Sequence, residues 1–405
     1  MSADEGKFEA WLQVAEKVAQ ELRRTGAARD LAGAAPVEEV DLLRRSGLLT
    51  IFLPEALGGG GAKVHHVPKI VRTLAKGDTS IAQIAAHHLF GTALGANGPN
   101  RALFLRRARG FVEQGWFHGG VAQAAYEPLI SAAPAPGGFS LNGAKPFATG
   151  AAVANTLHVW VRFAPDAEIG GGKVGGHIGQ FVVANPTPGL SFGDDWDNMG
   201  QRLTVSGRAT FENVFVSEED LVAHWREDEP LPPHVTLFVP IIQLAFGELY
   251  LGTAQGALEE AKDYIHKRAR PWLTSSARSA SEDTLVIERF GRLAVALASA
   301  EALADAAGEA IQRAVDRGAE LTARERGEAA VKSYQSKIQS TEVALEITSR
   351  IFELTGARST TRALGLDRYW RNVRTHSLHD PVHYKIMEVG GYALNDISPT
   401  PTYYS

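Results

Sequence analysis

Two histidines, His376 and His379, stand three residues apart in the most polar stretch of the chain, which runs from Arg368 to Lys385. Asp380 and Pro381 follow, a pair that predicts a helix start with Asp as N-cap and Pro at the first helical position. A helix N-terminus stabilises an anion and favours a neutral imidazole. The histidines are therefore candidates to pass a proton or a hydrogen bond to a developing oxyanion. The spacing supplies no third ligand for a metal, and the alternative is a polar contact between subunits.

A second pair, His87 and His88, lies in the apolar run SIAQIAAHHLFG, which we predict to be helical. Adjacent positions of a helix point about a third of a turn apart, so at least one of the two side chains faces inward. An inward histidine is usually a satisfied core residue. Here a histidine that lines a pocket is an equal alternative.

Arginines close to loop hydroxyls are candidates for binding a phosphate. Arg270 follows Arg268 near the expected end of a long helix, and Arg358 follows Gly356 in the run LTGARST. A guanidinium beside hydroxyl donors suits phosphate, but basic residues at a helix C-terminus are also favoured by the helix dipole. Trp196 is either a core residue or a surface on which a flat ligand stacks.

The glycine run GGGKVG at residues 170–175 has the G-x-G-x-x-G spacing of dinucleotide-binding loops. Strand-like segments flank it and no helix opens after it, so the run predicts a flexible hairpin. The sequence contains no phosphate-loop, H-E-x-x-H or G-x-S-x-G motif. This excludes the common nucleotide hydrolases, zinc proteases and serine hydrolases.

Three kinds of sequence pattern follow one another along the chain. The first part has apolar residues at spacings of three and four, which is typical of amphipathic helices. The second has short runs rich in Val, Phe and Thr between turn residues, the pattern of strands. The third returns to long helices, which we expect at 249–268, 283–317 and 322–355 and which indicate a four-helix bundle. We therefore predict an α+β fold with a helical domain at 1–114, a β domain at 115–233 and a helical bundle at 234–405.

The composition narrows the class of protein. The chain has 405 residues, a net charge of −5 and no cysteine. The lack of cysteine excludes disulfides, thiolate metal sites and a cysteine nucleophile, and no basic surplus indicates nucleic acid. The most apolar stretch, 235–251, is interrupted by polar residues and a proline, so a buried helix is expected there. The acidic N-terminus lacks a signal core, and a cytoplasmic location is expected.

Several segments together resemble the acyl-CoA dehydrogenase superfamily. LNGAKPFATGA from Leu141 and DNMGQRLTVSG from Asp197 resemble its flavin-contacting strands. ARPW at 269–272, GAR at 356–358, WRNVRTHSLHDPV from Trp370 and the final TYYS resemble a flavin-dependent monooxygenase branch, closest to the dibenzothiophene (desulfurization) monooxygenases. The resemblance covers essentially the whole chain. It implies a helical domain, a central β-barrel or sandwich and a C-terminal four-helix bundle.

The resemblance also implies the chemistry. A separate NAD(P)H-dependent flavin reductase would supply reduced FMN, and O2 would form a flavin C4a-hydroperoxide that oxygenates a sulfur compound. An aromatic thioether such as dibenzothiophene, converted to its sulfoxide or sulfone, is the expected substrate. Alkyl sulfones, indole or amines are alternatives for the same flavin chemistry. The enzyme would be a homotetramer, with no metal, nucleic acid or membrane partner.

The same resemblance assigns roles to particular residues. His379 would manage the proton of the reacting oxygen, with His376 as its neighbour and His88 as an active-site histidine of the N-terminal helices. Thr149, Ser206 and Trp196 would contact the flavin, and Arg270 and Arg358 would reach its phosphate from a neighbouring subunit. The residues expected at the substrate are His88, Phe90, Phe246 and Gly120.

Two other functions are weighed against this one. An FAD-dependent acyl-CoA dehydrogenase needs a carboxylate base, but Asp380 is short and is expected to cap a helix, and the segment VTLFVPIIQLAF contains no acid. A non-catalytic nucleic-acid-binding relative is disfavoured by the charge of −5. The monooxygenase is therefore the preferred hypothesis.

Overall fold

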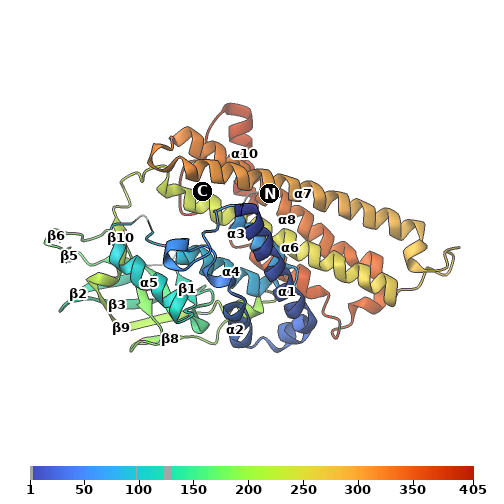
Figure 1. Cartoon of the computed structure of the whole chain (residues 1–405), viewed down its shortest axis with the longest axis horizontal. Helices are drawn as coiled ribbons and strands as arrows, with labels where there is room; N and C mark the ends of the chain where they lie inside the picture. Colours follow the sequence, from blue (N-terminus) through green and yellow to red (C-terminus); the bar gives the residue numbers. More distant parts are fainter. Residues whose placement is uncertain (1–2, 97, 123–128) are drawn as a thin grey trace.

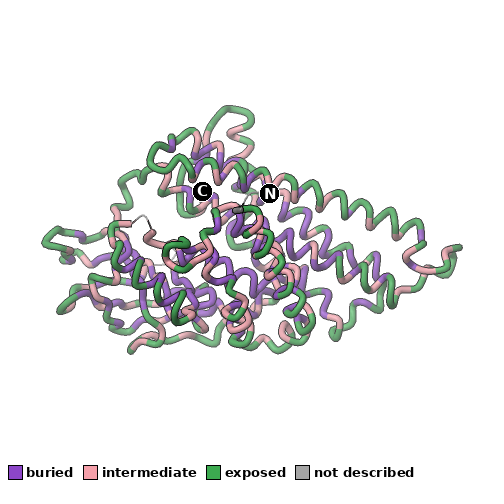
Figure 2. The backbone as a smooth tube through the Cα atoms, viewed as in Figure 1, coloured by how far each residue is buried: buried purple, intermediate pink, exposed green. Residues whose placement is uncertain are grey.

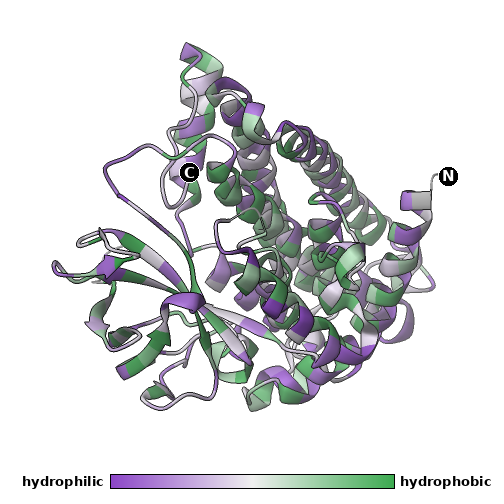
Figure 3. Ribbon diagram, turned by 60° about the vertical axis from the view of Figure 1, so that its left-hand side comes forward, coloured by the Kyte–Doolittle hydropathy of each residue, from purple (hydrophilic) through white to green (hydrophobic). Residues whose placement is uncertain are grey.

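The computed structural model describes residues 3–96, 98–122 and 129–405. A helical part comes first, a sheet follows, and a second helical part completes the chain (Figure 1). The sheet lies to one side of the molecule, and the long helices extend away from it on the other side (Figures 1 and 3). The fold class that the sequence predicts is confirmed.

The N-terminal part of the chain is helical, as its pattern of apolar residues predicts. Asp78 caps α4 by accepting hydrogen bonds from two backbone N–H groups, and Gly47 ends α2 in the left-handed conformation that glycine tolerates. Nearly every residue of α4 is buried, because the helix runs between the other N-terminal helices, the sheet and the bundle. The helices are α1 (Ala3–Ala32), α2 (Val37–Ser46), α3 (His66–Ala75), α4 (Thr79–Thr92) and α5 (Arg101–Glu113).

The central strands form a mixed sheet, where a barrel or sandwich was expected. Among the described residues, eight strands pair in the order β10-β7-β4-β2-β3-β9-β8, and β1 pairs with β4. Both β1 and β2 run parallel to β4. The strands are β1 (His118–Val121), β2 (Ile130–Ala135), β3 (Gly138–Lys145), β4 (Thr156–Phe163), β7 (Ile178–Ala184), β8 (Leu190–Phe192), β9 (Ala209–Ser217) and β10 (Leu221–Trp225).

The glycine run forms the hairpin that the sequence predicts. Strands β5 (Glu168–Ile169) and β6 (Gly172–Lys173) pair with each other, and Gly170 and Gly171 turn between them with positive φ angles. A side chain is strained in that conformation, so the glycines serve the turn and not a nucleotide.

The C-terminal part is built on three long helices, α6, α7 and α8, which pack against one another, with α10 against α8. Asp283 caps α7, and Thr322 and Glu325 form a capping box at the start of α8. The helices are α6 (Phe238–Lys267), α7 (Thr284–Asp316), α8 (Ala323–Thr355), α9 (Asp367–His376) and α10 (Val382–Asn395). The short 3₁₀ helices of the chain are η1 (Leu48–Thr50), η2 (Glu55–Leu57), η3 (Ala151–Val153), η4 (Arg202–Thr204), η5 (Glu218–Asp220), η6 (Val235–Leu237), η7 (Ala280–Glu282), η8 (Gly318–Glu320) and η9 (Ala357–Thr360).

Helix α6 joins two segments for which helices were expected separately, 235–251 and 249–268. Pro240 lies in its first turn, where backbone N–H groups have no intrahelical acceptor and a proline costs nothing. By length and composition the region Val235–Lys267 could cross a membrane, but 67% of its most apolar window is buried inside the protein. It packs on α3 and α8 as the central helix of the bundle (Figure 2).

One continuous apolar core joins the three parts. Buried residues of α3 and α4, of the sheet and of α6 and α8 belong to the same cluster. Side chains from distant parts of the sequence are therefore held rigidly against one another where these parts meet. The element order changes between Glu113 and His118 and between Trp225 and Phe238. We retain domain boundaries at 114 and 233 as a proposal.

Candidate active site

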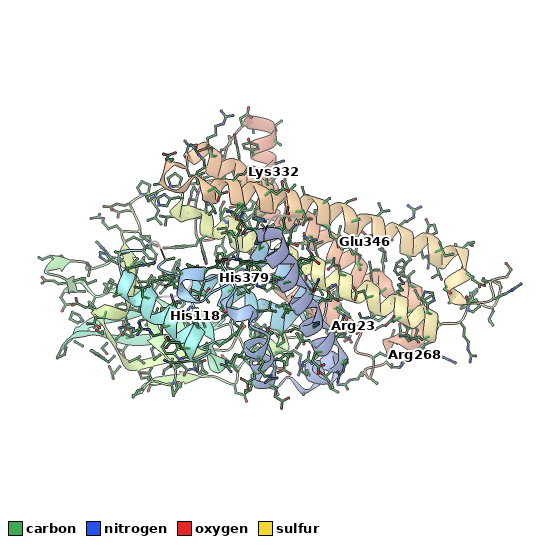
Figure 4. All side chains as sticks on the ribbon, in the orientation of Figure 1. Arg23, His118, Arg268, Lys332, Glu346 and His379 are labelled. Carbon is green, nitrogen blue, oxygen red and sulfur yellow. The ribbon has the colours of Figure 1, made fainter. Side chains whose placement is uncertain are left out.

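His376 and His379 lie together beside the central helix of the bundle. His376 is the last residue of α9, and His379 lies in the turn before α10 (Figure 4). Their rings stack with centroids 5.8 Å apart, and the Phe246 ring of α6 contacts them edge-on at 4.5 and 5.1 Å. Tyr404 of the C-terminal tail lies 6.0 Å from the His379 ring. The structure therefore brings Phe246 and the two histidines into one group.

His376 is buried and carries an unpaired polar atom. Its Nδ1 lies 2.9 Å from the Tyr250 hydroxyl, and its Nε2 has no partner among the described residues. No other partner of that hydroxyl is found in the same part of the chain, and the arrangement that pairs the hydroxyl hydrogen has Tyr250 donating to Nδ1, with the ring proton on Nε2. Burial, with the charges of His379 and Lys337, holds the pKa of His376 well below its usual value. His376 thus presents a neutral ring with a free N–H donor.

His379 is anchored differently. Its side chain is 44% exposed, and its Nδ1 lies 3.1 Å from Asp380 Oδ1. A carboxylate on Nδ1 leaves Nε2 to exchange a proton, as in other imidazole–carboxylate pairs. The prediction that Asp380 caps a helix is wrong. Helix α10 begins at Val382 after Pro381 without any side-chain cap, because the Asp380 carboxylate turns inward to Lys337.

A cradle of buried hydroxyls forms where β3 and η4 end. Thr149 Oγ1 lies 3.0 Å from Ser206 Oγ, which lies 2.8 Å from Thr204 Oγ1. The Trp196 indole donates to the backbone carbonyl of Gln201 at 2.8 Å. Thr149, Ser206 and Trp196, which the sequence assigned to one cofactor site, are therefore neighbours in the fold.

The backbone of this cradle is strained. Phe147, Gln201 and Val205 have φ angles of 60°, 54° and 43°, the left-handed region that non-glycine residues avoid. Val205 is β-branched, so its strain is the most costly of the three. Half of the Phe147 side chain is exposed, and its ring stands edge-on to Trp196 at 6.2 Å. Strain of this kind concentrates at ligand sites, which supports a binding role for the cradle.

Two helices connect the cradle to the histidines. The Gln201 N–H donates to Asn372 of α9 at 2.7 Å, and the Ser80 hydroxyl of α4 donates to Gln201 Oε1 at 2.9 Å. His376 follows Asn372 by four residues, and His87 follows Ser80 by seven, so each pair shares one helix face. The same two helix faces therefore contact the cradle and carry histidines of the site.

The second histidine pair is divided: His88 is held by the core, and we propose His87 as the histidine of the candidate site. Burial, followed by the charges of His158 and His379, lowers the pKa of His87 to about 3. Both ring nitrogens of His88 are used by backbone groups, with Nε2 2.9 Å from the Leu49 carbonyl oxygen and Nδ1 accepting from the N–H of His118 at 2.9 Å. The assignment of His88 to catalysis and substrate binding disagrees with these contacts. We transfer it to His87.

Two further residues assigned to the substrate have other surroundings. Phe90 belongs to the apolar core and stands edge-on to Phe52 at 5.9 Å. Gly120 lies on β1 against His158, where a Cβ would come within 2.4 Å of the imidazole. Gly120 therefore makes room for His158, whose Nδ1 lies 3.1 Å from His118 Nε2.

The two phosphate candidates lie away from this group within one chain. Arg270 and Arg358 are exposed, and the described residues provide no hydrogen bond or ion pair to either. They follow the C-terminal ends of α6 and α8, at the end of the bundle marked by Arg268 and distant from His379 (Figure 4). A role at the cradle of their own subunit does not agree with this position.

Sequence reasoning missed three residues of the site: Tyr250, Gln243 and Lys337. The first two lie on α6 with Phe246, at spacings of three, four and seven that place them on the histidine side of the helix. Lys337 is seven residues from both Ala330 and Ala344, two buried positions of α8. A lone lysine on an apolar helical face is the signal that could have identified it.

Known proteins match the chain along its length. The family model of the acyl-CoA dehydrogenase N-terminal domain matches residues 9–101, and that of the C-terminal domain matches 244–383. A dibenzothiophene monooxygenase from Mycolicibacterium goodii is 37% identical, over 97% of this chain and 96% of that protein. The methanesulfinate monooxygenase MsuC from Pseudomonas fluorescens is 37% identical, with a TM-score of 0.88 over 97% of this chain and 99% of that one. FMN-bound TdsC from Paenibacillus sp. A11-2 is 34% identical, with a TM-score of 0.90 over 98% and 100%.

These likenesses and the arrangement of histidines and hydroxyls agree with the resemblance found in the sequence. The chain belongs to the acyl-CoA dehydrogenase superfamily, in its branch of flavin-dependent monooxygenases.

Proposed function

We propose that this enzyme uses reduced FMN and O2 to oxygenate a sulfur compound, with an aromatic thioether such as dibenzothiophene as its substrate. One observation carries the proposal. The buried Nε2–H of His376 has no partner among the described residues, and it lies beside His379, on the helix that contacts the hydroxyl cradle. Together these groups supply a fixed donor and a proton-exchanging imidazole next to a binding surface.

The cradle fits a flavin in chemistry and in form. Hydroxyls of Thr149 and Ser206 can bond to polar ring atoms, and the rings of Phe147 and Trp196 offer flat apolar surface. The strained backbone around them is what a preformed ligand site requires. Reduced FMN would supply the electrons that activate O2, which no side chain of this composition can do.

The chain's own residues would then control the proton. His376 offers a hydrogen bond from a ring that burial keeps neutral, whereas His379 takes up and returns a proton through Nε2 while Asp380 holds Nδ1. Phe246 packs edge-on against both rings and places apolar surface beside them. The different surroundings of the two histidines give them different roles.

Dehydrogenation remains disfavoured for a structural reason. Asp380 is bonded to His379, Lys337 and Gln243 and is not a free base. Glu248, two residues after the end of the acid-free segment, is buried against Arg72 of α3 with an Oε1–Nη2 distance of 2.9 Å. Neither carboxylate is available to remove a proton from a substrate.

The assay follows from the proposed reaction. The protein is mixed with FMN, NADH, a flavin reductase and a panel of thioethers, alkyl sulfones, alkyl sulfinates, indole and amines, and mass spectrometry searches for a gain of oxygen. We expect oxygenated sulfur products that need both the protein and FMN. Reduction of a dye by acyl-CoA, with FAD tightly bound, would contradict the proposal.

We further propose a homotetramer in the cytoplasm, served by a diffusible reductase. Large apolar side chains are exposed on α7 and around α10, among them Leu285, Val295, Tyr384, Met387 and Leu394. Faces of this kind are covered in oligomers. A neighbouring subunit could also bring Arg270 and Arg358 to a cradle that they do not reach in their own chain.

Replacing Arg270 with alanine is expected to weaken FMN binding about 10- to 100-fold, because a charge-assisted contact to phosphate is lost. Fluorescence titration of FMN measures the affinity. Arg278→Ala, in the same exposed loop between α6 and α7, is the matched control and should leave affinity within about 2-fold. Equal affinity in the Arg270 variant and the wild type would remove the phosphate assignment.

A further inference from the structure

Lys337 is an almost fully buried lysine in the middle of α8. Its Nζ lies 2.5 Å from Asp380 Oδ2, and it also donates to the side-chain oxygen of Gln243. The ammonium lies 5.7 Å from the centre of the Phe246 ring, which contacts both site histidines. Lys337 is therefore linked to His379 through Asp380, and among the described residues no hydrogen bond joins Lys337 directly to the imidazole.

The Asp380 carboxylate joins the lysine to the histidine. Its Oδ2 accepts from Lys337 and, at 3.2 Å, from Gln243, while Oδ1 lies 3.1 Å from His379 Nδ1. Two donors on one oxygen fix the carboxylate plane, so the other oxygen stays directed at the imidazole. Burial alone would raise the pKa of Asp380, but the hydrogen bond with His379 and the charge of Lys337 hold it well below its usual range.

Fold stability does not explain an ion pair at this depth. Desolvation of two buried charges offsets most of their attraction, and apolar residues of similar volume often serve a fold equally well. Burial lowers the pKa of Lys337 to about 8 against the opposing effect of Asp380. The cation is thus retained at neutral pH in a place that disfavours it. Such groups are expected where a site needs their charge.

We propose that Lys337 is a positioning residue of the active site, which holds the Asp380 carboxylate in place so that His379 keeps a proton on Nδ1 and exchanges one through Nε2. The inference rests on the proposed function of His379. It gives a role to a residue that lies on a different helix from both histidines.

The first test removes the charge and keeps the length of the side chain. In Lys337→Met we expect kcat for sulfur oxygenation to fall about 10- to 100-fold, the effect typical of residues that orient a functional group, with KM and FMN affinity within about 2-fold. Lys385 is the matched control, because it is equally buried and pairs with Glu388 at 2.9 Å. Lys385→Met should keep kcat within about 3-fold. Equal losses in the two variants would overturn the positioning role.

A second readout needs neither flavin nor turnover. Diethyl pyrocarbonate acylates imidazole only in its unprotonated form, and peptide mass spectrometry can follow this at the partly exposed His379. In Lys337→Met, Asp380 keeps its charge without its cation, which stabilises the protonated imidazole. The pH of half-maximal labelling should rise by about one unit relative to the wild type and Lys385→Met. An unchanged or lowered midpoint would contradict the inference.

The other groups that face His379 are the same in the wild type, in Lys337→Met and in Lys385→Met. They are His376 on α9 and His87 on α4, while α6 and the C-terminal tail contribute the uncharged rings of Phe246 and Tyr404. A change in labelling therefore reports on Lys337 and Asp380.

The double variant Lys337→Met/Asp380→Asn distinguishes an effect on the stability of the fold from an effect on the position of the Asp380 carboxylate. It removes both charges of the pair, so the midpoint of thermal unfolding should return toward the wild-type value while kcat stays low. Recovery of kcat in the double variant would show that Lys337 has only a structural role, and would overturn the proposal. If the wild type oxygenates no sulfur compound, the proposed function fails, whereas the labelling shift at His379 still supports or overturns the role of Lys337.

Discussion

The His379→Ala variant is expected to lose kcat for sulfur oxygenation by about 100- to 10,000-fold, the range for removal of a general acid–base group. The imidazole is partly exposed and belongs to no apolar cluster, so its removal should leave the fold intact. Oxygenated product is measured by mass spectrometry against NADH consumed. We expect NADH to be consumed without a matching amount of oxygenated product, because reduced flavin still reacts with O2 when His379 is not there to exchange the proton.

The control for this variant lies four residues further along the chain. His383 is exposed on α10, and no hydrogen bond or ion pair to it is found in the part of the chain that the structure describes. His383→Ala should keep kcat within about 2-fold. Full turnover by His379→Ala would refute the assigned role, and a similar loss in both variants would point to the turn around α10 and not to the imidazole.

His376→Ala is expected to lower kcat by about 100- to 1,000-fold, the effect of removing one preorganised donor from a catalytic site. This variant should also unfold at a lower temperature, because the buried hydroxyl of Tyr250 loses its acceptor. Kinetics and thermal unfolding are measured on the same samples. The oligomer should survive, since α9 contributes this side chain to an internal contact.

Tyr250→Phe tests the same donor by a gentler change. It keeps the His376 ring and removes the hydrogen bond that places the ring proton on Nε2, so we expect a loss in kcat of about 5- to 10-fold. The two variants therefore form a graded series. Full turnover by His376→Ala, or a larger loss in Tyr250→Phe than in His376→Ala, would contradict the donor role of His376.

Elements with their own local signals were predicted well. The capping residues Asp283 and Thr322 mark the starts of α7 and α8, and the Gly170 hairpin forms as expected. Helix α6 was predicted as two pieces, at 235–251 and at 249–268, and Pro240 does not interrupt it because the first turn of a helix tolerates proline. The pairing order of the strands was not predicted, because strand pairing joins segments far apart in the sequence, which local patterns do not encode.

The candidate site shows the same difference between local sequence signals, which could be interpreted, and contacts between distant segments, which were not predicted. Sequence identified His376, His379, Thr149 and Ser206 as candidates through residue type and family resemblance. Family resemblance assigned the site histidine to His88, and neither that resemblance nor periodicity shows that the backbone groups of Leu49 and His118 hold the His88 ring. It also interpreted Asp380 as a cap, since the lysine that turns the carboxylate inward comes from another helix.

By itself, the sequence determined the element order, the superfamily and the kinds of group available for chemistry, because these depend on local patterns and on segments that can be compared directly. Only the tertiary structure decided which nitrogen of each histidine is free. Tyr250 of α6 sets the ring proton of His376, and Asp380, held by Lys337 of α8, orients His379. Proton positions and charge states depend on partners within a few ångströms, and packing supplies these partners from helices that are distant in sequence.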